Sequence, residues 1–386
     1  MYNFVFQNTT KLIFGKGTIS TLAQEIPAGK KLMITFGGGS VKSNGVYEEV
    51  VKALQGREFI EFWGIEPNPT VETIRKAVEI GKKEGIGYLL AVGGGSVIDG
   101  TKLIASSILL ERDPWDIVRK GAELDKVIPY ASVLTLPATG SEMNRGSVIS
   151  NREKREKFAF YTNSPEFSIL DPVTTFSLPD YQVACGIADT FVHVMEQYLT
   201  TTSQSPLMDR WAEGILLTLK EIAPTITKDH TNYDAMATFM LSATMALNGF
   251  IAMGVTQDWA THQIGHELTA LAGITHGHSL AVVLPGTMDI RRNEKGDKIL
   301  QYGQRVWGIT AKEDTEEAKS RAIDQIIEKS EEFFRSLGLK TRLSENSIGE
   351  DVVNEIVKRF KERDVHFGEN RMNDYVVTEK ILNRVK

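Results

Sequence analysis

Between residues 30 and 135, short apolar segments alternate with segments of helical periodicity, and this alternation narrows the possible folds more than any other feature. The expected strands cover residues 31–36, 58–62, 88–92 and 127–136, and the expected helices cover residues 46–54, 71–83 and 97–106. Strands separated by helices pair in parallel through right-handed crossovers, which predicts an open α/β sheet. Such sheets bind ligands beyond the carboxyl ends of their strands. We therefore expect a ligand site at that edge.

The pattern changes after Pro179, where helical periods dominate and strand signals fade. Apolar residues recur at helical spacing from Ile323 to Leu337, and Gly338 is placed as a C-terminal stop. A chain of 386 residues is long enough for two domains, each with its own core. We therefore predict a Rossmann-like α/β domain with a mostly parallel sheet over residues 1–178, and an all-α domain over residues 179–386.

Composition and charge argue against several classes of protein. The net charge of −6 offers no electrostatic footprint for nucleic acid. The sequence has no run of about eighteen apolar residues that could span a membrane, and its N-terminus lacks the features of a signal peptide. The single cysteine, Cys185, excludes an intramolecular disulfide and a Cys-rich zinc site. We expect a cytoplasmic protein that binds neither nucleic acid nor membrane.

The sequence Gly-Gly-Gly-Ser occurs twice, each time directly after an expected strand. In Gly93–Ser96 the glycines would let the backbone approach a pyrophosphate, and the N–H groups of the following helix would favour its charge. Asp99, in the first turns of that helix, could accept bonds from ribose or nicotinamide groups, whereas Lys102 is expected to be solvated. The spacing is not G-x-G-x-x-G, so an ordinary Rossmann site is not expected in detail. A turn that binds nothing is the alternative, but three glycines exceed what a turn needs.

The earlier sequence, Gly37-Gly38-Gly39-Ser40, bears on the choice of dinucleotide. Sites for NAD commonly place a carboxylate near this strand end to bind the adenosine ribose. Here glycines, a serine and the nearby Lys42 leave room, hydrogen-bond donors and positive charge for a 2′-phosphate. We therefore expect NADP(H), with NAD(H) as the second possibility; an incidental lysine beside a plain turn is the alternative.

The histidines are clustered in a way that predicts a metal site. Asp189 and His193 are four residues apart in a segment of helical character, which places both on one face. Four of the seven histidines lie within seventeen residues: His262, His266, His276 and His278. Spacing alone leaves open which three imidazoles would complete the ligand set. Oxygen and nitrogen ligands without thiolate suit Fe(II), Zn(II) or a similar divalent ion.

Together these motifs resemble the iron-containing (group III) alcohol dehydrogenases over nearly the whole chain. The resemblance is carried by Ile13–Gly17, Gly93–Asp99, Asp189-x-x-x-His193 and His262-x-x-x-His266-(x)9-His276-Gly277. Three further segments look most like the branch of NADPH-dependent aldehyde reductases and butanol dehydrogenases: Phe36–Lys42, Gly64–Pro69 and Gly265–Ala270.

The resemblance implies an N-terminal dinucleotide-binding domain, a helical metal-binding domain similar to that of dehydroquinate synthase, an active site between them and a homodimer. The implied metal ligands are Asp189, His193, His262 and His276, with His266 beside the substrate. Because imidazole titrates near neutrality, we expect His266 to be the proton donor. The implied nucleotide contacts are Gly38, Gly39 and Ser40 at the ribose phosphate, Gly94, Gly95 and Ser96 at the pyrophosphate, Asp99 on the nicotinamide side, and also Gly37, Thr135, Thr139, Asn144 and Lys157. The loop 136–142 is shorter than in the wider family, which leaves contacts in this loop open.

The expected activity is metal-dependent hydride transfer between NADP(H) and small aliphatic aldehydes or primary alcohols, such as butanal and butanol. Enzymes of the same fold, such as glycerol dehydrogenase or dehydroquinate synthase, are the main alternative. A metal-dependent hydrolase or lyase would not account for the two Gly-Gly-Gly-Ser turns, because hydrolysis does not need them. A nucleotide-sensing protein without turnover would leave the metal ligands unexplained.

Overall fold

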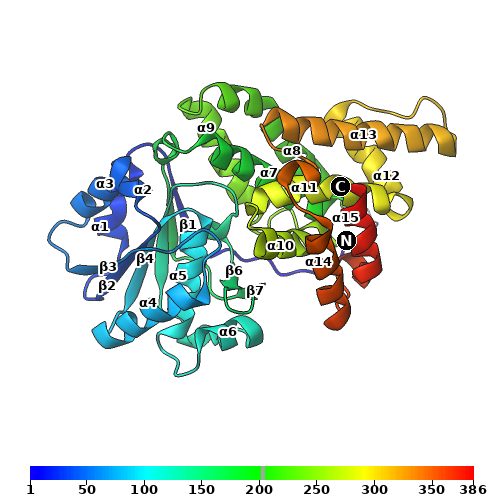
Figure 1. Cartoon of the computed structure of the whole chain (residues 1–386). Coiled ribbons are helices and arrows are strands. Elements are labelled where there is room, and N and C mark those ends of the chain that lie inside the picture. Colours follow the sequence, from blue (N-terminus) through cyan, green and yellow to red (C-terminus); the bar gives the residue numbers. More distant parts are fainter. Residues whose placement is uncertain (201–204) are drawn as a thin grey trace. The chain divides into compact units, whose positions relative to one another are not determined.

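A computed structural model of the chain describes residues 1–200 and 205–386, which form two compact units (Figure 1). The sheet unit consists of Gln7–Leu178 and Asp229–Asn248. The helical unit consists of Met1–Phe6, Pro179–Lys228 and Gly249–Lys386. A single domain boundary at residue 178 would therefore place Met1–Phe6 in the sheet unit and Asp229–Asn248 in the helical unit. In the structure, the first six residues pack with the helical unit and Asp229–Asn248 packs with the sheet unit.

The sheet has six parallel strands in the order β1-β8-β5-β4-β2-β3. Their bounds are β1 Lys11–Phe14, β2 Leu32–Phe36, β3 Phe59–Phe62, β4 Tyr88–Gly93, β5 Tyr130–Leu134 and β8 Phe167–Leu170. A separate antiparallel hairpin is formed by β6 Gly146–Asn151 and β7 Glu156–Tyr161. Because β2 and β4 are neighbours, with Phe36 opposite Val92, the two Gly-Gly-Gly-Ser sequences that follow them meet at the same edge of the sheet.

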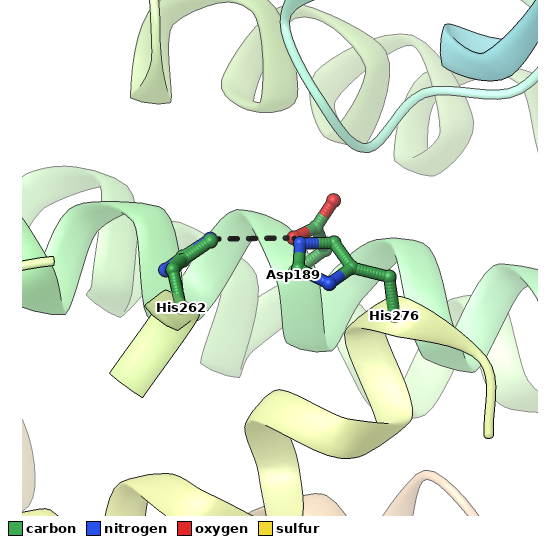
Figure 2. Close-up of side chains that lie close together, drawn as sticks. All are labelled: Asp189, His262 and His276. Carbon is green, nitrogen blue, oxygen red and sulfur yellow. Dashed lines mark ion pairs between the residues drawn. The ribbon is translucent and has the colours of Figure 1, made fainter. Parts of the chain in front are cut away.

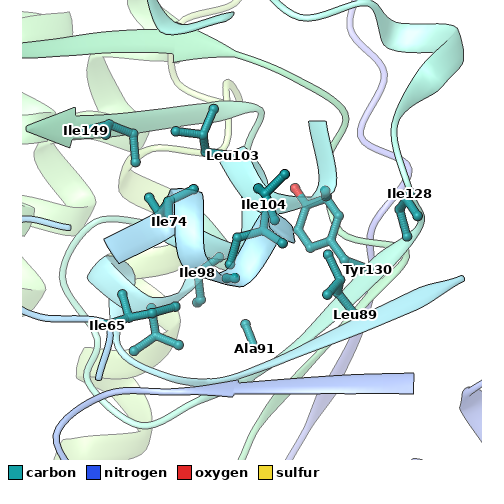
Figure 3. Packing of buried hydrophobic residues seen from close by; sticks show 14 of the residues in the cluster. Ile65, Ile74, Leu89, Ala91, Ile98, Leu103, Ile104, Ile128, Tyr130 and Ile149 are labelled. Carbon is teal, nitrogen blue, oxygen red and sulfur yellow. The ribbon is translucent and has the colours of Figure 1, made fainter. Parts of the chain in front are cut away.

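Helices cover both faces of this sheet (Figure 1). The bounds are α1 Leu22–Glu25, α2 Ser40–Ser43 and α3 Val46–Ala53 on one face, α4 Val71–Glu84, α5 Gly95–Ser107 and α6 Pro114–Lys120 on the other, and α9 Tyr233–Ala246 from the later segment. Alternation along β2 directs Leu32, Ile34 and Phe36 into the first layer and Met33 into the second. Helix α5 is buried nearly all round, and Figure 3 shows its Ile98, Leu103 and Ile104 packed in the second layer.

The helical unit contains eight α-helices among its described residues. They are α7 Asp180–Tyr198, α8 Pro206–Lys228, α10 Ala260–Ala272, α11 His276–Ile290, α12 Arg292–Tyr302, α13 Glu316–Ser336, α14 Glu350–Glu362 and α15 Tyr375–Arg384. Both α7 and α11 are buried over most of their length, so they form the centre of this unit. Over residues 1–200 and 205–386, each helix is too short or too polar to be a membrane-spanning segment.

The predicted fold class is confirmed: a parallel α/β sheet is followed by a helical region. The four expected strands lie within two or three residues of β2, β3, β4 and β5, and the helix predicted around Ile323–Leu337 is α13. Strands β1 and β8 and the β6–β7 hairpin were not predicted from the sequence. The first two are only four residues long, and strands of that length carry little periodicity.

Candidate metal centre and dinucleotide site

Helix α7 supplies the first two predicted metal ligands. Asp189 and His193 lie one turn apart on the same face of the helix, and each is only 3% exposed. Nε2 of His193 lies 3.6 Å from Oδ1 of Asp189. A carboxylate and an imidazole are therefore held together inside the helical unit.

Helices α10 and α11 bring two more imidazoles to the same carboxylate oxygen. Nε2 of His262 lies 3.9 Å and Nε2 of His276 lies 3.7 Å from Oδ1 of Asp189 (Figure 2). The ligand atoms of Asp189, His262 and His276 all lie within 4.8 Å of one another. Ligands at zinc–nitrogen and zinc–oxygen distances in a tetrahedron are about 3.4 Å apart, so this spacing suits one ion after a small contraction.

Close helix packing explains how His276 reaches this position. The residue after it is Gly277, where a Cβ atom would lie only 2.1 Å from the carbonyl oxygen of Cys185 on α7. Any larger residue would push the start of α11 away from α7. Glycine at this position therefore allows His276, the first residue of α11, to lie beside Asp189.

The structure separates the two remaining histidines of the cluster. Nδ1 of His278 lies 3.0 Å from the hydroxyl of Tyr181 and its Nε2 lies 2.8 Å from the carbonyl oxygen of Lys340, so both nitrogens have partners away from Asp189. His266 is half-buried, and its ring centroid lies 5.0 Å from that of His276. His266 thus lies beside His276, next to the predicted metal ligands.

Glu196 and Trp259 were not among the predicted site residues, yet both contact His262. Oε1 of Glu196 accepts a hydrogen bond from the backbone N–H of His262 at 2.9 Å and lies 3.1 Å from its Nδ1. The Trp259 ring lies 5.1 Å from the His262 ring, edge to face. Burial and the nearby Asp258 carboxylate raise the pKa of Glu196, whereas the backbone N–H of His262 and the nearby Lys295 ammonium oppose this rise. The sequence signal was available, because Asp189, His193 and Glu196 are spaced i, i+4, i+7 along one helix.

In the sheet unit, the two glycine sequences have different surroundings. A Cβ on Gly94 would lie 2.9 Å from Leu136 and one on Gly95 would lie 2.3 Å from Thr139 Oγ1, so packing against the loop after β5 already requires these glycines. By contrast, no described atom lies within 4 Å of a Cβ built on Gly38 or Gly39. The excess of glycine after β4 is therefore explained by close packing, whereas the space beside Gly38 and Gly39 is open to a ligand.

The buried pair Asp99 and Lys102 differs from expectation. Lys102 is fully buried and not solvated; its Nζ donates to Ser141, Asn144 and the carbonyl of Gly146. The Asp99 carboxylate accepts from Ser141 Oγ at 2.6 Å and from a backbone N–H of β6 at 2.8 Å. Burial raises the pKa of Asp99 and lowers that of Lys102 to about 8, while their mutual attraction opposes both shifts. The predicted contact of Asp99 with the nicotinamide side therefore competes with bonds that hold the protein together.

Three other residues that were expected to contact the nucleotide lie around the same turn: Thr135, Thr139 and Asn144. Thr135 follows β5 and its N–H donates to the carbonyl of Gly93, and Thr139 packs on Gly95. The side-chain amide of Asn144 is bonded on both sides, since Oδ1 accepts from Lys102 and Nδ2 donates to the carbonyls of Thr139 and Leu247. Asn144 thus fixes the loop, and a role in lining the nucleotide groove stays a prediction.

Lys157 reaches the turn from strand β7. Its Nζ donates to Oδ1 of Asn68 at 2.8 Å, and the N–H of Asn68 donates to Ser96 Oγ at 3.3 Å. Two hydrogen bonds, both made by Asn68, therefore link the ammonium group of Lys157 to Ser96 of the second Gly-Gly-Gly-Ser sequence. This arrangement suits the attraction of a phosphate to the start of α5.

Lys42 belongs to an aromatic cluster beside the first Gly-Gly-Gly-Ser sequence. Its Nζ lies 4.1 Å from the centroid of the Trp63 ring, which is stacked on Phe36 at 4.1 Å. The segment carrying Trp63 is joined to the turn, since the N–H of Gly64 donates to the carbonyl of Gly37. Trp63 is the feature here that the charge argument from the sequence did not include.

Comparison with known proteins gives a consistent family for both units. Residues 9–172 match the iron-containing alcohol dehydrogenases, and residues 183–383 match the C-terminal region of the Fe-containing alcohol dehydrogenase family. Among curated relatives, the NADPH-dependent aldehyde reductase YqhD of Escherichia coli is 46% identical, with 100% of each chain covered. The NADH-dependent butanol dehydrogenase A of Clostridium acetobutylicum is 38% identical, with 93% of each chain covered.

Solved structures agree with these sequence relatives. The crystal structure of E. coli YqhD superposes with a TM-score of 0.96 at 44% identity, covering 100% of this chain and 99% of the other. The NADH-dependent butanol dehydrogenase A of Thermotoga maritima superposes with a TM-score of 0.93 at 34% identity, with the same coverage.

Proposed function

Since this chain belongs to the iron-containing alcohol dehydrogenase family, we propose that it is a metal-dependent aldehyde reductase and alcohol dehydrogenase that prefers NADP(H). Its proposed substrates are small aliphatic aldehydes and primary alcohols such as butanal and butanol. The named activities of the aldehyde reductase and butanol dehydrogenase relatives support this proposal.

The observation that carries the proposal is the gathering of three imidazole nitrogens within 4 Å of one buried carboxylate oxygen. We propose Asp189, His193, His262 and His276 as the ligands of one divalent ion. One carboxylate and three neutral imidazoles leave such an ion with a net positive charge. The donor set accepts Fe(II) or Zn(II), and we propose iron first because of the family.

The bound groups and the protein's own residues have separate proposed roles in the reaction. When bound, the ion would polarise a substrate carbonyl and the reduced nicotinamide would supply hydride to its carbon. His266, half-buried beside His276, would supply the proton that completes the alcohol, because an imidazole titrates near neutrality. The backbone at Gly94–Ser96, with Lys157 nearby, would hold the pyrophosphate.

The preference for NADP(H) rests on the first Gly-Gly-Gly-Ser sequence. Gly38 and Gly39 have open space beside them, and Lys42 places a positive charge close to this turn. A 2′-phosphate would gain charge-assisted hydrogen bonds there. The curated relatives use both dinucleotides, so the preference is decided by local residues and not by the family. A homodimer stays a prediction of the resemblance.

One experiment tests the proposal directly. The purified protein should oxidise NADPH when butanal is added, lose this activity after chelation and regain it with Fe(II) or Zn(II). The variant His262→Ala should lose activity while still binding NADPH, since it removes a metal ligand and leaves the sheet unit intact. Full activity of that variant, or of metal-free protein, would contradict the proposed role of the metal.

A further inference from the structure

Glu196 lies on the same face of α7 as two of the proposed metal ligands. Asp189, His193 and Glu196 are spaced i, i+4, i+7, and all three are 3% exposed. The Glu196 side chain lies behind His262 as seen from Asp189, because it contacts Nδ1 of that imidazole whereas Asp189 lies near Nε2.

The Glu196 carboxylate caps the start of α10. It accepts a hydrogen bond from the backbone N–H group of His262. The residue at the N-cap position, Trp259, offers no side-chain cap of its own. The N-terminus of a helix carries free N–H groups and a positive partial charge, both of which favour a carboxylate. A residue of α7 therefore fixes where α10 begins.

Trp259 itself is held in an unusual conformation at this point. Its φ of 68° lies in the left-handed region, which is uncommon for a bulky residue. Its indole ring lies 5.1 Å from the His262 ring and 6.1 Å from the His193 ring. Trp259, directly before α10, thus packs against two of the proposed ligands.

We propose that Glu196 is a positioning residue for the metal centre. It keeps the proton of His262 on Nδ1 and directs the lone pair of Nε2 toward the proposed metal position beside Asp189. The inference rests on the proposed metal-dependent function. An imidazole that donates Nδ1–H to a carboxylate has a fixed tautomer, a fixed ring orientation and a more basic Nε2. Each of these effects strengthens binding of a cation at Nε2.

The test compares Glu196→Gln with the matched variant Glu213→Gln. Glu213 is another buried glutamate of the helical unit, bonded to Tyr198, Arg210 and Arg305. Glu196→Gln keeps the shape of the side chain and one acceptor oxygen, but it removes the negative charge that faces the backbone N–H and Nδ1 of His262. We expect its dissociation constant for Zn(II), measured by competition with a chelator, to rise about 10- to 100-fold. Glu213→Gln should stay close to the wild-type value.

The melting temperature of each variant without metal shows whether a loss of metal affinity comes from a less stable fold or from a misplaced ligand. Equal metal affinity in Glu196→Gln and wild-type protein, or an equal loss in both variants, would overturn the inference. Failure of the wild-type protein to bind Zn(II) or Fe(II) would instead contradict the proposed function itself.

A second measurement needs no folded variant. In zinc-loaded wild-type protein labelled with ¹⁵N-histidine, long-range ¹⁵N–¹H correlation should show His262 protonated at Nδ1 and bound to zinc through Nε2. Coordination through Nδ1, or a proton on Nε2, would overturn the role given to Glu196.

Discussion

Lys42 is held over the Trp63 ring, and this contact places its ammonium group beside the first Gly-Gly-Gly-Ser turn. A lysine in open solvent would lose side-chain entropy on binding a phosphate, whereas one already ordered on an aromatic face loses less. The pair Lys42 and Trp63 is therefore the physical basis that we propose for a preference for NADP(H).

We expect Lys42→Ala to raise KM for NADPH about tenfold or more, because a hydrogen bond to a charged group contributes about 1.5–3 kcal/mol. KM for NADH should change little, since NADH has no 2′-phosphate. Steady-state kinetics with both dinucleotides measure the effect, and Lys52→Ala, on the exposed surface of α3, is the control. An equal rise for NADH and NADPH would contradict the assignment.

His266 is expected to act in the chemical step and not in binding. In His266→Asn we expect kcat to fall about 100-fold or more, the usual contribution of a positioned proton donor. Metal content and NADPH affinity should be unchanged, as measured by atomic absorption and fluorescence titration. His366→Asn is the control because His366 is exposed and lies outside the histidine cluster. A normal kcat in His266→Asn would remove His266 from the mechanism.

Single residues also show what a sequence can reveal about a site. The clustering of histidines predicted a metal centre, but the spacing could not separate His276 from His278, which are two residues apart. The difference lies in their partners, since His278 is bonded to Tyr181 and Lys340, residues distant in sequence. The burial of Lys102 was missed for the same reason, because its three acceptors lie in the distant segment that leads from β5 into β6.

At the scale of elements, the two turns that follow β2 and β4 are chemically alike and structurally different. The turn after β4 is packed against the loop that follows β5, whereas the turn after β2 is partly exposed and has open space beside it. Both connect a parallel strand to a helix, so the alternating pattern predicted them equally well. Their packing depends on loops that carry no periodic signal, and it could not be predicted.

Matched glycine substitutions should separate the two turns. Gly95→Ala would place a Cβ 2.3 Å from Thr139, so we expect a clear fall in melting temperature. Gly38→Ala meets no described atom within 4 Å, so its stability should be near wild type while its affinity for NADPH falls. Thermal unfolding and NADPH titration of both variants test this pair. Unchanged NADPH affinity in Gly38→Ala would argue against a ligand beside that turn.

At the scale of the whole molecule, the chain passes between its two units more than once. Helix α9, from the later part of the chain, packs with the sheet unit: Met240 joins the second core layer, and Thr244 donates to the buried Glu142. The sequence predicted a single boundary near residue 179, since periodicity identifies a helix without showing which core it joins.

We expect a fragment of residues 7–178 to lack a cooperative thermal transition, because the absence of α9 exposes part of the core and leaves Glu142 buried without Thr244. Joining residues 229–248 to this fragment through a flexible linker should restore the transition, as measured by circular dichroism. Cooperative unfolding of the fragment alone would contradict the role given to α9.

The return of α9 to the sheet also constrains how the chain can fold during synthesis. A nascent chain that has just released Leu178 from the ribosome has all six strands but cannot yet complete their core. By the time α9 emerges, α7 and α8 have already left the exit tunnel, and they belong to the other unit. The sheet unit can therefore complete its core only after α7 and α8 have emerged, and these two helices must wait for residues 249–386 before their own core can form.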